Sequence, residues 1–262
     1  MTFLGRSLQD EVAFITGASA GIGAAIAERL AACGATVVLG ARRMEKLDAV
    51  ADAIRNKVDG ANVVTHTLDV NDGASVDAWL AHGEQQAGPC TVLVNNAGLA
   101  AGVGHAHNAD LGDWSLMLDT NVRAAFALTR KVLPGMLERG KGDLVNIASV
   151  AGSDSYPGGS VYCATKAALQ KFAECVRKET VGKGIRVMTF DPGLVETEFS
   201  VVRFGDAEKA KTPYKGIDPL TGDDVADCVA FAVTRERHVC IDRMLVLCSQ
   251  QASATMVVRR EE

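Results

Sequence analysis

Short apolar runs alternate with longer amphipathic segments along most of the chain. We expect strands at seven runs, namely 11–16, 35–40, 62–68, 91–95, 142–148, 184–190 and 244–248. Several are apolar without alternation, which is typical of strands buried on both faces of a parallel sheet. Helical patterns lie between them, at 21–33, 43–58, 73–87, 113–138, 160–182 and 222–234. This rhythm predicts one α/β domain over residues 1–262, a doubly wound parallel sheet with helices on both faces.

One stretch, residues 199–220, interrupts the rhythm. It is polar and holds two of the six prolines of the chain. Long irregular insertions in α/β folds are often lids over a site. We therefore expect an irregular substrate lid at 199–220, and we refer to these residues as the lid segment.

Composition and charge exclude several classes of partner. The formal net charge is -5 and no run of Lys and Arg is longer than two residues, so we expect neither a nucleic acid nor a membrane surface as partner. No apolar run is long enough to span a bilayer. The seven cysteines form no C-x-x-C pair, which favours reduced thiols in a cytoplasmic protein. His105 and His107 lack further ligands at metal-binding spacing, so we expect no metal.

A glycine-rich turn follows the first strand, where residues 16–23 read T-G-A-S-A-G-I-G. Its glycines permit a tight turn and a close approach of the backbone to a pyrophosphate, and the next helix offers free N–H groups. A turn without a ligand is the alternative, but the position between a strand and a helix favours dinucleotide binding. The cofactor contacts expected here are Gly17, Ser19, Ala20, Gly21, Ile22 and Gly23.

The end of the second strand indicates which dinucleotide binds. An acidic residue there would accept hydrogen bonds from the ribose of NAD, but the chain reads Ala41, Arg42, Arg43. A guanidinium can hold a 2′-phosphate through paired hydrogen bonds. Surface charge at a helix start is the simpler alternative, although it leaves the missing acid unexplained. We predict NADP(H), with Arg42 as the main 2′-phosphate contact and Arg43 beside it.

The spacing T-G-x-x-x-G-x-G, together with Y-C-A-T-K at 162–166, resembles the short-chain dehydrogenase/reductase family. The resemblance implies a Rossmann-type sheet of about seven strands and a cofactor that lies along several strand ends. The N-N-A-G segment at 95–98 would be part of that site, although Asn and Gly also favour plain turns. The further cofactor contacts that the resemblance implies are Asp69, Val70, Asn96, Ala97, Gly98, Tyr162, Lys166, Pro192, Gly193, Val195 and Thr197.

Four residues match the catalytic pattern of this family: Asn121, Ser149, Tyr162 and Lys166. Tyr162 and Lys166 are four residues apart and share one helix face. A phenol has a pKa of about 10, and a nearby cation can lower it by roughly 1–3 units. Tyr162 would then exchange a proton with a substrate oxygen that Ser149 also holds. The resemblance adds that Lys166 binds the nicotinamide ribose and that Asn121 holds a water.

Each of the four has a plainer interpretation on its own. A Tyr and a Lys at this spacing often form a solvated helix surface, and Ser149 and Asn121 could cap helices. The agreement of all four in type and order favours catalysis. Asp191 stands where a neutral residue is expected, and the sequence offers no role for it.

The substrate is less clearly indicated. Residues 192–204 and 214–220 resemble a subgroup of NADP-dependent 3-hydroxy acid dehydrogenases, which act on serine and related acids, and relatives that reduce sulfoacetaldehyde. We therefore expect a small polar hydroxy acid or oxo-anion, contacted by Ser149, Tyr162 and Arg203. Arg203 could pair with its carboxylate or sulfonate, or be a solvated lid charge. The alternatives are a reductase of a larger neutral ketone or aldehyde, and a non-catalytic NADP(H)-sensing protein.

The resemblance also implies a homotetramer, a dimer of dimers. The expected helix 113–138 has more apolar surface than one sheet face needs. In this family the corresponding helix and the helix at 160–182 pack between subunits.

Overall fold

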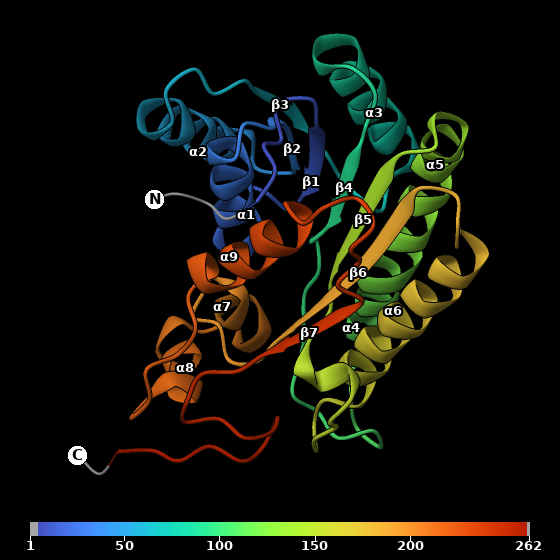
Figure 1. Cartoon of the computed structure of the whole chain (residues 1–262). Helices are drawn as coiled ribbons and strands as arrows, with labels where there is room; N and C mark the ends of the chain where they lie inside the picture. The colour runs from blue at the N-terminus through green and yellow to red at the C-terminus, as the bar shows by residue number, and fades with distance from the viewer. Residues whose placement is uncertain (1–4, 261–262) are drawn as a thin grey trace.

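The computed structural model describes residues 5–260, which form one seven-stranded parallel sheet of order β3-β2-β1-β4-β5-β6-β7 (Figure 1). The doubly wound sheet is therefore confirmed. The strand order reverses between β1 and β4, and such a switch point is where open α/β sheets bind ligands. The strands are β1 (Val12–Thr16), β2 (Thr36–Ala41), β3 (Val63–Thr67), β4 (Val92–Asn95), β5 (Gly142–Ile147), β6 (Ile185–Pro192) and β7 (Arg243–Val246).

Helices cover both faces of the sheet (Figure 1). One face carries α1 (Gly21–Ala32), α2 (Met44–Lys57) and α9 (Gly222–Val233), and the other carries α3 (Gly73–Ala87), α4 (Leu111–Leu118), α5 (Ala124–Arg139) and α6 (Ser160–Glu179). Successive strand residues point to opposite faces, so Phe14 and Ile15 belong to two different hydrophobic cores. No helix within residues 5–260 is both long and apolar enough to cross a bilayer.

The segment expected as one helix at 113–138 is divided. Between α4 and α5 lies a π-helical turn, η1 (Asp119–Arg123), and Asn121 is at its centre. A π turn changes the direction in which its side chains project, and such turns often lie at functional sites. The hydrophobic periodicity alone did not reveal this interruption.

The lid segment is not irregular, so that expectation was wrong. It folds into α7 (Phe199–Phe204), α8 (Ala207–Lys211) and a 3-10 turn, η3 (Thr212–Tyr214). The Asp206 carboxylate caps α8 by accepting hydrogen bonds from two backbone N–H groups of its first turn. The Tyr214 hydroxyl donates to the Val195 carbonyl at 2.9 Å, which ties the lid segment to the loop after β6.

A buried ion cluster lies where β5 and β6 begin. The Asp143 carboxylate is fully buried and pairs with Arg186 at 2.6 Å and Arg237 at 2.7 Å. Asp143 and Arg186 are register partners on neighbouring strands, so the pair joins β5 to β6 directly. A buried carboxylate is tolerated only with such partners.

Candidate active site

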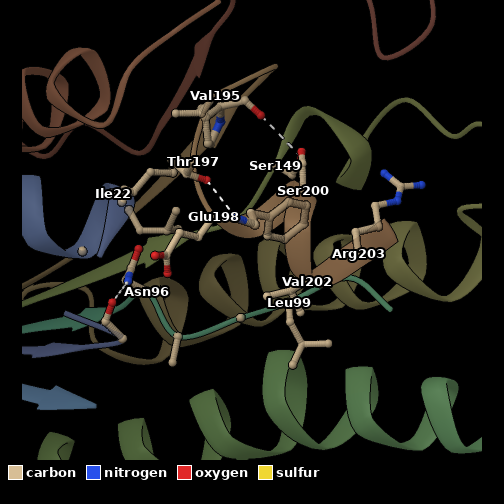
Figure 2. A pocket seen from close by; sticks show the side chains of 18 of the residues that line it. Ile22, Asn96, Leu99, Ser149, Val195, Thr197, Glu198, Ser200, Val202 and Arg203 are labelled. Carbon is tan, nitrogen blue, oxygen red and sulfur yellow. Dashed lines mark hydrogen bonds between the residues drawn. The ribbon is translucent and has the colours of Figure 1, made fainter. Parts of the chain in front are cut away.

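A cleft of about 510 Å³ opens at the carboxyl ends of the strands, a volume typical of cofactor sites. Every residue that the sequence assigned to cofactor or substrate lines it. Of the four catalytic candidates, only Asn121 is not on its wall. Ile22 and Asn96 lie at one end and Arg203 at the other (Figure 2).

The glycine turn has the geometry that a phosphate cradle requires. Gly17 and Gly21 adopt left-handed backbone conformations, with φ of +66° and +55°. A Cβ at Gly23 would lie 2.5 Å from the Gly17 carbonyl oxygen, so only glycine fits there. No side chain caps the start of α1 after Ala20, and its first N–H groups are left for a ligand in the cleft.

Asn96 holds this turn rather than projecting freely into the cleft. Its side-chain Nδ2 donates to the carbonyls of Thr16 at 2.8 Å and Gly17 at 3.2 Å. The Thr16 hydroxyl in turn accepts hydrogen bonds from the backbone N–H groups of Asn96 and Ala97. The N-N-A-G segment therefore holds the glycine turn in place through hydrogen bonds to Thr16 and Gly17.

Two charged residues that the sequence analysis did not identify, Glu198 and Lys46, lie next to Arg43 at the end of the cleft. Glu198, directly before α7, pairs with Arg43 at 2.8 Å and Lys46 at 2.6 Å, and these cations lower the pKa of its carboxyl. Arg43 also donates to the Ser19 hydroxyl at 3.3 Å. Arg42 is exposed and makes no ion pair within the described chain. Lys46 could have been identified from the sequence, because it follows Arg43 at helical spacing. Glu198 could not, because it is 152 residues from Lys46.

The reacting groups meet at the middle of the cleft. Lys166 donates from Nζ to the Ile147 carbonyl at 2.9 Å, and its Nζ lies 5.8 Å from the centre of the Tyr162 ring. The Ser149 hydroxyl accepts from the Ala151 N–H at 3.1 Å, so it caps the short turn η2 (Val150–Gly152). The capping interpretation of Ser149 is thus correct, and the same hydroxyl also lines the cleft.

The pKa of Tyr162 does not follow the sequence-based expectation. Burial raises the pKa of its phenol above the ordinary value of 10.0, and the Ser149 hydroxyl offsets this only in part. Lys166 does not bring this pKa below its ordinary value, because desolvation is the larger effect. Burial also lowers the pKa of Lys166 to about 8, and the charge of Asp191 acts against that shift.

Asn121 lies behind the cleft and its side chain is fully bonded to protein. Its Nδ2 donates to the Leu99 carbonyl at 2.8 Å and the Thr165 hydroxyl at 3.1 Å. Its Oδ1 accepts from the Leu99 N–H at 2.9 Å. The Asn121 amide therefore fixes the chain just after β4, and its role toward a water stays a prediction.

At the far end of the cleft, Arg203 projects from α7 (Figure 2). Its guanidinium lies 5.2 Å from the centre of the Tyr156 ring and 5.6 Å from that of Phe204. Its buried Nε has no hydrogen-bond partner, and no carboxylate within residues 5–260 pairs with it. The sequence missed Tyr156, which also lines the cleft.

The two loop histidines do not extend the site. His105 and His107 are exposed, and their ring centres are 6.0 Å apart. In the described part of the chain, no three His, Cys, Asp or Glu side chains gather closely enough to hold a metal ion.

Several known proteins resemble this chain over most of its length. Residues 11–207 match the model of the short chain dehydrogenase family. An NADP-dependent 3-hydroxy acid dehydrogenase of Schizosaccharomyces pombe is 42% identical over 97% of this chain and 98% of its own length. Sulfoacetaldehyde reductase 2 of Chromohalobacter salexigens is 38% identical over 96% and 99%. The closed form of a serine dehydrogenase, crystallised with NADP+, superposes with a TM-score of 0.88 at 40% identity, covering 95% of this chain and 100% of that one.

Proposed function

The chain belongs to the short-chain dehydrogenase/reductase family and is an NADP-dependent oxidoreductase, and from this premise we propose that it interconverts a carbonyl and an alcohol on a small anionic substrate. One observation carries the proposal: a single cleft joins the glycine turn and Arg42 to Ser149, Tyr162 and Lys166. A dinucleotide that spans this cleft would bring its nicotinamide end beside the reacting side chains.

The cleft fits an NADP(H) molecule by its chemistry. The N–H groups at the start of α1 suit a pyrophosphate, and the guanidinium of Arg42, which makes no ion pair within the part of the chain that the structure describes, suits a 2′-phosphate. Lys166 would hold the nicotinamide ribose, and Val195 and Thr197 would lie near the carboxamide. The bound cofactor supplies the hydride.

The chain's own groups handle the proton. Because burial raises the pKa of Tyr162, its phenol is protonated at neutral pH and suited to donate a proton to a carbonyl oxygen. The Ser149 hydroxyl lies beside it and would hold the same oxygen. The Lys166 ammonium would stabilise the phenolate that remains, and it keeps its proton below a pH of about 8. In the oxidative direction the same groups act in reverse.

Arg203 supports the proposed class of substrate. Its guanidinium lines the cleft, and among residues 5–260 it has no carboxylate partner and its buried Nε has no hydrogen-bond acceptor. A carboxylate or sulfonate on the substrate would supply the missing acceptor. The names of the relatives, a 3-hydroxy acid dehydrogenase and a sulfoacetaldehyde reductase, both describe small molecules that carry such an anion.

A substrate panel tests this proposal. We expect NADPH oxidation with sulfoacetaldehyde or small 3-oxo acids, and NADP+ reduction with serine or 3-hydroxy acids, at rates above those for bulky neutral ketones. The Arg203→Ala variant should raise KM for anionic substrates about 10–100-fold, the loss of a charge-assisted hydrogen bond of about 1.5–3 kcal/mol. KM for a small neutral aldehyde should not change.

The matched control is Lys209→Ala, which removes an exposed positive charge from α8 of the same lid segment. It should leave all KM values unchanged. A preference for bulky neutral ketones would favour the alternative reductase, and tight NADPH binding without turnover on the whole panel would favour a sensor.

We further infer that the protein is a homotetramer. Leu111, Leu116 and Leu118 of α4 are exposed, with Leu111 at 69%. Phe231 of α9 and Leu245 of the edge strand β7 are exposed as well. Large exposed apolar side chains on more than one element suit a dimer of dimers. Light scattering should give about four times the 27.5 kDa mass of the chain, and a monomer would refute the inference.

We also infer that the protein works in the cytoplasm. All seven cysteines are free, and Cys90, Cys163 and Cys248 are buried. Free thiols are expected in a reducing compartment.

A further inference from the structure

A carboxylate that the sequence left without a role lies directly behind the reacting groups. Asp191 is near the end of β6, one residue before Pro192 of the cleft wall, and its side chain is 0% exposed. Asp191 itself does not line the cleft. Burying a carboxylate costs several kcal/mol unless partners compensate it, so these partners indicate what it does.

Two side chains from different elements compensate Asp191. Gln170 of α6 donates to it from Nε2 at 2.9 Å, and Arg243 of β7 forms an ion pair with it. The same Gln170 Nε2 also donates to the main-chain carbonyl of Ser149 at 3.1 Å. One amide therefore connects Asp191 to the backbone of a reacting residue.

The connection closes into a ring of hydrogen bonds. The Ser153 hydroxyl donates to Gln170 Oε1 at 3.3 Å and accepts a hydrogen bond from Arg243. Gly152 leaves the space that the amide needs, since a Cβ there would lie 2.5 Å from Gln170 Nε2. A ring in which every member is bonded holds its parts more rigidly than separate bonds would.

Asp191 also acts on Lys166 through space. Lys166 is only 5% exposed, and Gln170 follows it by one helical turn on the same face of α6. Among the described residues, Asp191 on β6 is the one charged group that raises the pKa of Lys166. Tyr162 is the titratable group next to Lys166 on α6. Ile147 of β5 offers only its carbonyl. Arg243 of β7 forms an ion pair with Asp191 and partly neutralises the charge of its carboxylate.

We propose that Asp191 is a positioning residue: it fixes Ser149 through Gln170 and keeps Lys166 charged. The ion pair with Arg243 determines how strongly the Asp191 carboxylate acts on Lys166. The role in catalysis rests on the proposed function of Ser149, Tyr162 and Lys166. The electrostatic part concerns Lys166 alone and can be measured without turnover.

The experiment compares Asp191→Asn with Arg243→Gln. Removing the carboxylate charge favours neutral Lys166, so the alkaline limb of the kcat profile should move to lower pH by about one pH unit. Removing the guanidinium leaves Asp191 less neutralised, so Arg243→Gln should move the limb to higher pH. A residue that only supports the fold would not produce shifts of opposite sign.

Gln170→Ala separates the two parts of the proposal. It cuts the link to the Ser149 carbonyl but keeps the charge of Asp191, so it should lower kcat by about tenfold or less, the scale of one neutral hydrogen bond. The alkaline limb should stay in place. Thermal unfolding confirms that each variant is folded, and Arg243→Gln alters a side chain that is 39% exposed, so it provides a test even if Asp191→Asn does not fold.

A direct titration distinguishes failure of this inference from failure of the proposed function. In protein labelled with [¹³Cε]lysine and without cofactor, NMR should show the Lys166 pKa lower in Asp191→Asn and higher in Arg243→Gln than in the unaltered protein. Unchanged values, or shifts of the same sign, would overturn the inference. The expected shifts together with full activity of Tyr162→Phe would instead overturn the proposed catalytic role.

Discussion

Replacement of Tyr162 by Phe is expected to lower kcat for carbonyl reduction by about 10²–10⁴-fold, the usual contribution of a general acid. The substitution removes only the hydroxyl, and the Phe ring keeps the contact with Phe199, whose ring centre lies 5.7 Å from that of Tyr162. Because the phenol is the proton donor and not a phosphate contact, the Kd for NADPH should change little. Steady-state kinetics and NADPH fluorescence titration measure the two quantities separately.

A second tyrosine provides the comparison for this variant. Tyr214 also lines the cleft, but its hydroxyl bonds to Ser200 and to the Val195 carbonyl and so supports the lid segment. Tyr214→Phe should therefore affect KM more than kcat, by about tenfold or less for one neutral hydrogen bond. Near-normal kcat in Tyr162→Phe would refute the assignment of the proton donor.

The Arg42→Ala variant is expected to raise KM for NADPH about 10–100-fold, since it removes a charge-assisted hydrogen bond to the 2′-phosphate. KM for NADH, which lacks this phosphate, should stay the same, so the preference between the two cofactors is the measured quantity. The structure favours Arg42 over Arg43 for this contact, because Glu198 already pairs with Arg43 and Lys46.

The control for Arg42 is Arg55→Ala. Arg55 lies near the other end of α2 and pairs with Asp52, away from the cleft. It carries the same charge, so an effect of net charge alone would appear in both variants. Faster turnover with NADH than with NADPH in the unaltered protein would contradict the cofactor assignment from the outset.

Glu198 introduces a competition that affects how this experiment is interpreted. Its carboxylate occupies two of the cations near the predicted phosphate site and connects α2 to the start of α7. A 2′-phosphate would offer those cations a second anion. A moderate effect of Arg43→Ala on NADPH binding would therefore be consistent with Arg42 as the main contact.

Local pattern was sufficient for the fold, whereas most site residues were assigned through the family resemblance. All seven predicted strands are present and the sheet is parallel, as predicted. Buried strands and amphipathic helices can be recognised because each has its own periodicity of apolar residues over a short stretch of sequence. The glycine turn and the pair Tyr162 and Lys166 were candidates from the sequence, because their chemistry depends on spacing along one turn or one helix face. The strand-end rule then correctly brought them to one cleft.

Contacts between distant segments decided the rest. Glu198 meets Lys46 across 152 residues, and Asp191 meets Arg243 across 52, distances over which sequence pattern carries no signal. The pKa of Tyr162 was predicted in the wrong direction because it depends mainly on how completely neighbouring segments exclude water. The sequence by itself thus determined which groups can react, whereas only the tertiary structure decided their burial, their partners and hence their charge.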